Sequence, residues 1–129
     1  MKTDRVFAVD DDESYRALLE LVLLTQCGVS EVRTFARGEQ AVAALCALAP
    51  GERPALLLLD FHMPGLDGLG VLRALADAGL QLPVVVLSNA AGAQERKACL
   101  AAGAREVLAK PARMEDLALI LRLQLEQHG

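Results

Sequence analysis

Short apolar runs alternate with helical apolar patterns five times along the chain. Apolar residues follow one another without a break at 6–9, 55–59 and 83–87. Such short runs are typical of strands that are covered on both faces, as in the middle of a parallel sheet. Between the first two runs, Leu18, Leu19 and Val22 recur at helical spacing, and Gly28 follows as a helix-ending residue. The pattern predicts strands and helices in strict alternation.

The predicted elements give a fold class. Strands are expected at Arg5–Val9, Glu31–Phe35, Ala55–Leu59, Pro83–Leu87 and Arg105–Leu108, and helices at Ser14–Gln26, Gly38–Leu48, Leu69–Ala78, Ala93–Ala102 and Met114–Glu126. Strands separated by helices of this length form a parallel sheet with helices on both faces. We therefore expect one domain over residues 1–129, an α/β, flavodoxin-like (βα)5 three-layer sandwich with strand order 2-1-3-4-5.

Composition agrees with a packed domain and restricts its partners. Of 129 residues, 53% are apolar and only 3% aromatic, so the core must consist of Leu, Val and Ala. The net charge is −4, and no stripe of Lys and Arg exists, which argues against nucleic-acid binding. Neither a long apolar stretch nor a signal-peptide pattern is present, so we expect a cytoplasmic protein without membrane contact. Cys27, Cys46 and Cys99 are expected to be reduced and mostly buried thiols, with no metal or redox role.

Charged and hydroxyl side chains stand at the carboxyl ends of the predicted strands. Asp10 and Asp11 follow the first strand, Asp60 the third, Ser88 the fourth and Lys110 the fifth. Open α/β sheets bind ligands at this edge, and the expected strand order brings the three aspartates together. Crowded carboxylates repel unless a cation lies between them.

Mg²⁺ suits such a cluster because it prefers oxygen ligands and uses few carboxylates. Asp11 and Asp60 are the first candidates as direct ligands, Asp10 binds directly or through water, and the backbone carbonyl of His62 could complete the set. A carboxylate beside a metal can also accept a phosphoryl group, which Lys110 and Ser88 would then contact.

Each of these residues also has an ordinary alternative role. Asp11 and Asp12 could cap a helix, Ser88 could simply end a strand, and Lys110 could be a solvated turn residue. It is their joint occurrence at four successive strand ends that favours the phosphoryl site.

Over almost its whole length, Val6 to Leu125, the chain resembles the receiver domains of two-component response regulators. The matching residues are Asp10-Asp11, Asp60 with Met63-Pro64-Gly65 and Asp67-Gly68, Ser88, Gly103-Ala104, and Lys110-Pro111. The resemblance implies that Asp60 accepts a phosphoryl group, with Mg²⁺, from a histidine kinase or a histidine phosphotransfer protein. It also implies that Ser88 and Lys110 contact the phosphoryl group. The face made by the fourth helix, the fifth strand and the fifth helix would then respond, and would bind an output partner or a second copy of the chain.

Three positions depart from the family pattern. Val107 stands where receivers often have an aromatic residue, so a coupled movement of a hydroxyl and an aromatic ring cannot occur in that form. Asn89 replaces a small residue after Ser88. Ala112 stands where many transcription-factor receivers have Phe, which weakens the case for their type of dimer.

Three alternatives are left open: an enzyme, a cofactor carrier, and a receiver that is part of a longer protein. A haloacid-dehalogenase-like phosphatase also uses a strand-end Asp, but it would need an acid where this chain has His62. A flavodoxin-like FMN carrier needs a glycine- and hydroxyl-rich phosphate loop where this chain has the acidic run 10–13. The chain could also be the receiver part of a longer transcription factor or output enzyme.

Three finer predictions concern single positions. The Lys110–Pro111 peptide bond is predicted to be cis, on the strength of the family resemblance. Self-hydrolysis of the phosphoryl group is predicted to be slow and governed by His62 and Ala90. Leu119 and Leu123 are predicted to remain partly exposed on the fifth helix and to form a dimer or partner contact.

Overall fold

The five strands form one parallel sheet. The computed structural model describes residues 5–89 and 92–126, so Ala90 lies outside the described residues. Its strands are β1 (Arg5–Val9), β2 (Glu31–Phe35), β3 (Leu56–Asp60), β4 (Val84–Ser88) and β5 (Glu106–Ala109), and every neighbouring pair is parallel. Their order is β2-β1-β3-β4-β5, which confirms the predicted fold class.

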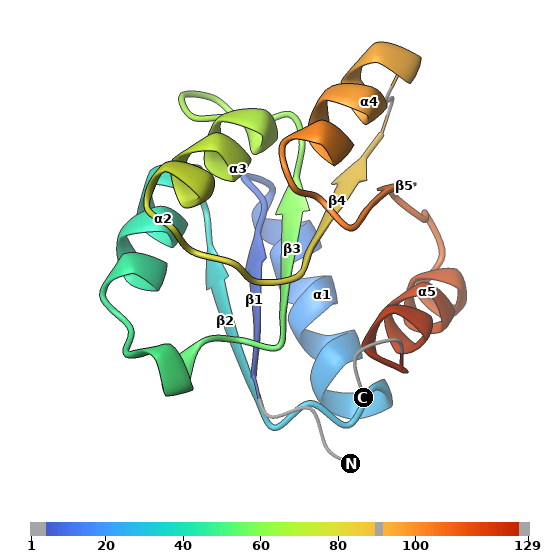
Figure 1. Ribbon diagram of the computed structural model, residues 1–129. Helices are drawn as coiled ribbons and strands as arrows, with labels where there is room; N and C mark the ends of the chain where they lie inside the picture. The colour runs from blue at the N-terminus through green and yellow to red at the C-terminus, as the bar shows by residue number, and fades with distance from the viewer. Residues whose placement is uncertain (1–4, 90–91, 127–129) are drawn as a thin grey trace.

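Five α-helices cover the two faces of the sheet (Figure 1). They are α1 (Glu13–Gln26), α2 (Gly38–Cys46), α3 (Gly68–Asp77), α4 (Ala93–Ala101) and α5 (Met114–Glu126), and a short 3₁₀ helix, Pro50–Glu52, follows α2. Helices α1 and α5 pack on one face, against the side chains of Val6, Ala8, Leu56 and Leu58. Helices α2, α3 and α4 pack on the other face, against Phe7, Val9, Leu57 and Leu59. Neighbouring residues of one strand therefore serve opposite cores, as the pleat requires.

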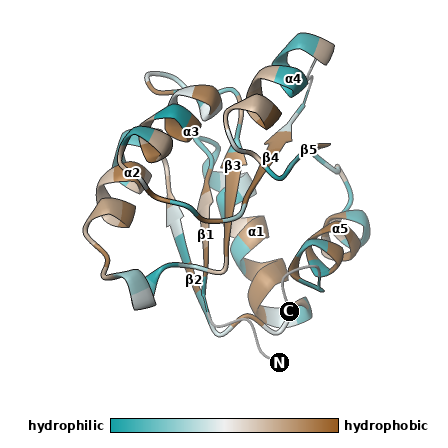
Figure 2. Cartoon of the chain, in the orientation of Figure 1, coloured by the Kyte–Doolittle hydropathy of each residue, from teal (hydrophilic) through white to brown (hydrophobic). Residues whose placement is uncertain are grey.

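The central strands are hydrophobic along their length, whereas β2 at the edge is mixed (Figure 2). All five residues of β3 and all five of β4 are buried. This burial explains why the strands were recognisable as unbroken apolar runs.

The predicted element boundaries hold within two residues. Strands β1 and β2 and helix α5 match the prediction, and the other elements begin or end one or two residues away. The largest difference is at the end of α2, which was expected to reach Leu48. There the Leu48 amide donates to the Leu45 carbonyl, an i→i−3 bond that closes the helix as a tight turn.

The prediction for the cysteines was wrong at one position. All three thiols are free, Cys99 is buried and Cys27 half-buried, but Cys46 is exposed. Because α2 turns Ala41 and Leu45 toward the core, the next residue points about 100° away, into solvent. Within the described residues, no helix is both long and apolar enough to cross a lipid bilayer.

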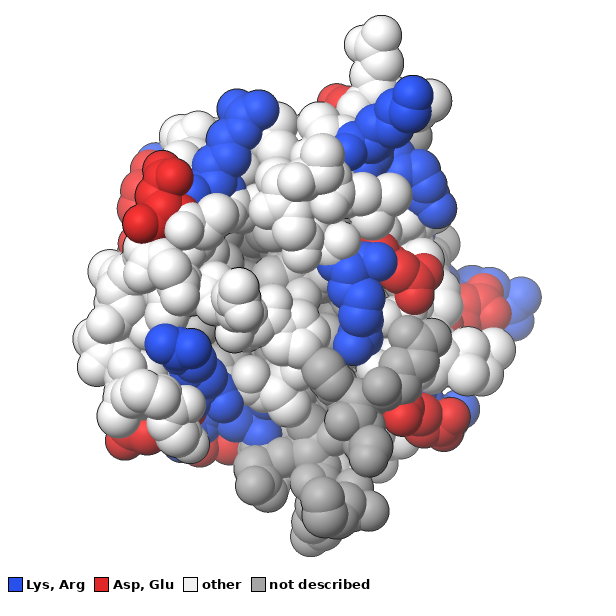
Figure 3. Space-filling view, viewed as in Figure 1, with Lys and Arg blue, Asp and Glu red and all other residues white. Residues whose placement is uncertain are grey.

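Surface charge is scattered rather than grouped. On the face seen in Figure 3, most lysine and arginine side chains are separated by neutral and acidic surface, and two lie together at the upper right. This distribution fits the expectation that the chain has no nucleic-acid-binding stripe.

Candidate functional site

The predicted residues meet at the carboxyl edge of the sheet. Asp10 directly follows β1, and its amide donates to the Phe35 carbonyl at 3.0 Å. Asp60 is the last residue of β3, where it pairs with Leu87 of β4. Ser88 ends β4, and its carbonyl accepts a hydrogen bond from the Lys110 amide at 3.0 Å. Each side chain is thus placed by the sheet ladder itself, and Asp10, Asp60 and Ser88 are all buried.

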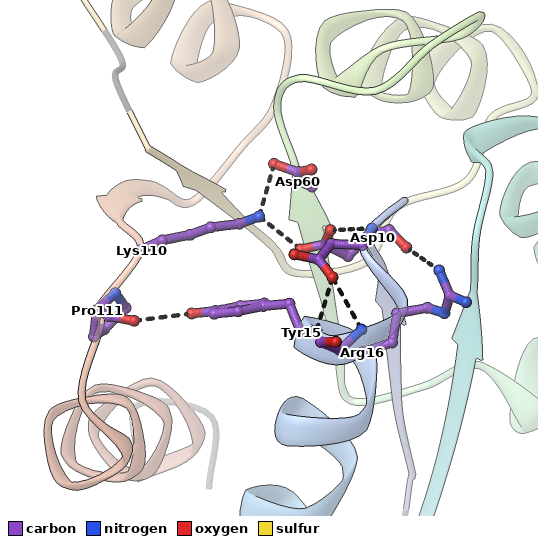
Figure 4. Close-up of polar contacts among 8 residues, drawn as sticks. Asp10, Tyr15, Arg16, Asp60, Lys110 and Pro111 are labelled. Atoms are coloured by element: carbon purple, nitrogen blue, oxygen red, sulfur yellow. Dashed lines mark hydrogen bonds and ion pairs between the residues drawn. The ribbon is translucent and has the colours of Figure 1, made fainter.

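The Lys110 ammonium joins two of the aspartates (Figure 4). Its Nζ lies 2.7 Å from Oδ2 of Asp10 and 3.3 Å from Oδ1 of Asp60. Both carboxylates and the lysine side chain are at most 9% exposed, so the pairing is little screened by water. Burial disfavours the charged lysine, but the hydrogen bonds and charges of Asp10 and Asp60 raise the pKa of Lys110 above its ordinary value.

Asp60 is the carboxylate whose acidity is most altered. Burial, followed by the negative charge of Asp10, raises the pKa of Asp60 to about 6, although Lys110 acts in the opposite direction. A lone lysine therefore does not fully balance the negative charge that is gathered at this edge.

A divalent metal ion fits the remaining charge. Asp10, Asp11 and Asp60 each offer a carboxylate oxygen, and these atoms lie within 4.8 Å of one another. Asp11 is exposed and the other two are buried, so the cluster opens to solvent on one side. An all-oxygen donor set with an open side suits Mg²⁺, which keeps several of its waters. Asp12, in contrast, caps helix α1 by accepting from the Ser14 amide at 2.9 Å.

The loop after Asp60 is packed tightly against the start of α3. The Gly68 amide donates to the Phe61 carbonyl at 2.9 Å. A Cβ atom at position 68 would lie 2.9 Å from Cα of Phe61 and 3.0 Å from the carbonyl oxygen of Asp60, so only glycine allows this approach. The backbone that follows Asp60 is therefore packed closely against the start of α3.

His62 and Asn89 lie at the rim of the site rather than inside it. The His62 side chain is 54% exposed, with Nε2 3.8 Å from Oε2 of Glu95 on α4, and its ring packs edge-on against Phe61. Asn89 is exposed. The role of the His62 carbonyl as a metal ligand, and the influence of His62 and Ala90 on phosphoryl lifetime, stay predictions.

The prediction of a cis Lys110–Pro111 bond is wrong. Among the described residues every peptide bond is trans. The trans form is intrinsically favoured by about 0.5–1 kcal/mol before Pro, and the ammonium reaches both Asp10 and Asp60 from the trans backbone. The contacts of Lys110 with Asp10 and Asp60 therefore do not require the cis isomer.

Tyr15 is a site residue that the sequence reasoning missed. Its ring centroid lies 4.6 Å from the Lys110 ammonium. Burial, with the charges of Asp10 and Asp60, raises the pKa of Tyr15 to about 12. Its place in the first helical turn after an acidic run was the available signal.

Val107 lies on β5 beside helix α4. Val107 is buried, and its carbonyl accepts a hydrogen bond from the Arg96 guanidinium of α4. An arginine from the neighbouring helix therefore contacts the strand at the position where receivers often carry an aromatic ring.

Comparisons with known proteins agree on one family. A family model described as the response regulator receiver domain matches residues 6–122. The response regulator MprA of Mycobacterium ulcerans is 39% identical over 127 residues, which cover 95% of this chain and 52% of that protein. The protein-glutamate methylesterase/protein-glutamine glutaminase 5 of Myxococcus xanthus is 43% identical over 108 residues, covering 83% of this chain and 30% of that protein. The chain thus spans about half the length, or less, of these curated relatives.

Solved structures give the same fold. The phosphorylated cyanobacterial phytochrome response regulator RcpA superposes with a TM-score of 0.83 and 27% identity, covering 98% of this chain and 94% of that one. A CheY-like receiver domain protein from Methanospirillum hungatei superposes with a TM-score of 0.81 at 23% identity, covering 98% and 97% of the two chains.

Proposed function

Because the chain belongs to the response regulator receiver domain family, we propose that Asp60 is its phosphoacceptor and that the domain passes a signal by being phosphorylated there. The observation that carries this proposal is the contact of one half-buried lysine, Lys110, with both Asp10 and Asp60 at the carboxyl edge of the sheet. The proposed donor is a phosphohistidine of a histidine kinase or of a histidine phosphotransfer protein.

The chemistry is a transfer between two nucleophiles. A carboxylate oxygen of Asp60 attacks phosphorus, the P–N bond to the donor imidazole breaks, and an acyl phosphate remains on Asp60. Asp10, Asp11 and Asp60 would hold Mg²⁺, which supplies positive charge to the phosphoryl oxygens when it is bound.

The remaining groups orient the phosphoryl oxygens. Lys110 already stands within 3.3 Å of Asp60 and can donate to one oxygen without a large movement. Ser88 is the last residue of the neighbouring strand β4 and offers a hydroxyl donor to another phosphoryl oxygen. No ester substrate is turned over in this scheme, which sets it apart from a haloacid-dehalogenase-like phosphatase.

A small phosphodonor tests the assignment. With acetyl phosphate and Mg²⁺, intact-mass spectrometry should find one added phosphate, labile to base and hydroxylamine as an acyl phosphate is. Asp60→Asn should abolish the addition, and Asp11→Asn should weaken Mg²⁺ binding and slow it. Asp12→Asn is the matched control, since asparagine also caps helices and the acid lies at the same edge. A phosphate recovered on the Asp60→Asn protein would overturn the assignment.

The output of the signal is proposed to leave through α4, β5 and α5. This choice follows from Lys110, which lies directly between β5 and α5 and contacts Asp60. Because the chain spans about half of its curated relatives, an output domain that follows the receiver stays a second possibility beside a free-standing partner or a homodimer. A cytoplasmic location is proposed, since the donor chemistry depends on cytoplasmic kinases.

A further inference from the structure

Tyr15 lies directly against the Lys110 ammonium. The distance from Nζ to the ring centroid is 4.6 Å, inside the range of about 6 Å over which an aromatic face attracts a cation. Figure 4 shows the ring running beneath the lysine side chain, with Asp60 on the other side. The ammonium is therefore bordered by two carboxylates and one aromatic face.

The same side chain also contacts the residue that follows Lys110. The phenol hydroxyl of Tyr15 donates a long hydrogen bond, 3.4 Å, to the Pro111 carbonyl, across 96 residues of sequence. Tyr15 thus spans both members of the Lys-Pro pair, one with its ring and the other with its hydroxyl.

The backbone at Tyr15 is fixed by the cap of helix α1. The residue stands in the first turn of α1, and its amide donates to the capping carboxylate of Asp12 at 3.3 Å. A tyrosine ring has two rotatable side-chain bonds, whereas a lysine side chain is flexible along its whole length. Contact with a fixed ring therefore reduces the number of positions open to the Lys110 ammonium.

We propose that Tyr15 is a positioning residue for Lys110, holding the ammonium at the place where it meets a phosphoryl group on Asp60. The proposal rests on the proposed function of Asp60. A purely structural role is also conceivable, because Tyr15 packs at the margin of the core that α1 and α5 form with the sheet. A leucine would serve that packing role, but it would leave the ammonium without its aromatic neighbour.

A spectroscopic test examines the contact without any phosphate. Protons of the Lys110 side chain that lie over the ring should be shifted upfield in the NMR spectrum by the ring current. The shift should persist in Tyr15→Phe and disappear in Tyr15→Leu, with the exposed Lys97 of α4 as the internal reference. Absence of the shift in the unaltered protein would overturn the proposal.

A kinetic test examines the positioning. With acetyl phosphate and Mg²⁺, Tyr15→Phe should be phosphorylated within about twofold of the unaltered rate, and Tyr15→Leu roughly 3- to 10-fold more slowly. Leu18→Ala is the matched control, since Leu18 is a half-buried residue of α1 in the same core cluster. It should lower stability and leave the rate unchanged.

The outcomes separate the two proposals. If the unaltered protein and Tyr15→Leu are phosphorylated at the same rate, Tyr15 does not position Lys110. If the unaltered protein takes up no phosphate, the proposed function of Asp60 fails, and the positioning role for phosphotransfer fails with it. The NMR shift would in that case still establish the Tyr15–Lys110 contact.

Discussion

At the scale of single residues, the site contains a carboxyl group, Asp60, whose charged form is disfavoured in the folded chain. Asp60 is 6% exposed and faces Asp10 as well as Lys110, and its pKa is raised to about 6. The folded protein therefore binds this proton more tightly than the unfolded chain does. The stability that depends on Asp60 is highest below its unfolded pKa, near 3.8, and is lost as pH rises through about 6.

Asp60→Asn should consequently stabilise the domain at neutral pH. In the absence of Mg²⁺, the free energy of unfolding at pH 7.5 should rise on the order of 1–2 kcal/mol, and the gain should shrink toward pH 4. Urea unfolding at a series of pH values measures both. Asp77→Asn removes an exposed carboxylate at the end of α3 and should change stability by no more than about 0.5 kcal/mol. An equal gain at pH 4 and pH 7.5 would contradict the account.

Some residues of the site could be predicted from the sequence, and others could not. Asp60, Ser88 and Lys110 could be assigned because each follows an apolar run, and parallel strands bring their carboxyl ends to one edge. Tyr15 could not, since its contact with Lys110 depends on how α1 sits beside the turn after β5. The trans bond before Pro111 departs from what the family resemblance implies and agrees with the intrinsic preference of the peptide bond.

At the scale of elements, α4 is the helix held least firmly. Of its nine residues only Cys99 is buried. Its polar connections to the rest of the molecule include the Arg96 bond to the Val107 carbonyl and the His62–Glu95 pair at 3.8 Å. Helices with few buried apolar residues open more readily than the rest of the fold.

Removing the Arg96 bond should loosen α4 alone. In Arg96→Ala, amide hydrogen exchange across α4 should be roughly three- to tenfold faster, because a hydrogen bond from a charged donor is lost. Exchange in α5 should not change. Lys97→Ala, on an exposed neighbour in the same helix, is the control. Hydrogen–deuterium exchange with mass spectrometry follows both helices at once. If α4 exchanges at the same rate in Arg96→Ala and Lys97→Ala, the Arg96 bond does not hold this helix in place.

At the scale of the whole molecule, the layered fold was the most predictable property. The alternation of runs and helical patterns determined the sheet order, because crossover connections between parallel strands leave few arrangements. The outer surface was less predictable, but the exposure of Leu119 and Leu123 on α5 is confirmed, at 52% and 49%. What covers them stays a prediction.

A dimer or output partner is expected to contact this pair of leucines after phosphorylation. Leu119→Asp/Leu123→Asp should abolish self-association, or binding to the output partner, in Mg²⁺ and beryllofluoride. Sedimentation velocity measures the self-association. The matched control is Leu21→Asp/Leu24→Asp, an apolar pair on α1 with comparable exposure, 49% and 41%. If both double variants behave like the unaltered protein, the patch has no such role.

The opposite side of α5 carries a buried polar group with a consequence for this surface. Gln124 is 4% exposed, its side-chain oxygen accepts from Arg105 at 2.7 Å, and its amide nitrogen donates to Glu106 at 2.8 Å. These directional bonds fix the rotation of α5 about its own axis, which apolar contacts alone would leave less strictly defined. Leu119 and Leu123, in contrast, are 52% and 49% exposed and carry no such directional bonds. If the predicted contact at Leu119 and Leu123 exists, the residue that orients α5 and the residues that meet a partner are different ones, so a lineage could change its partner at positions 119 and 123 and keep Gln124 with its bonds.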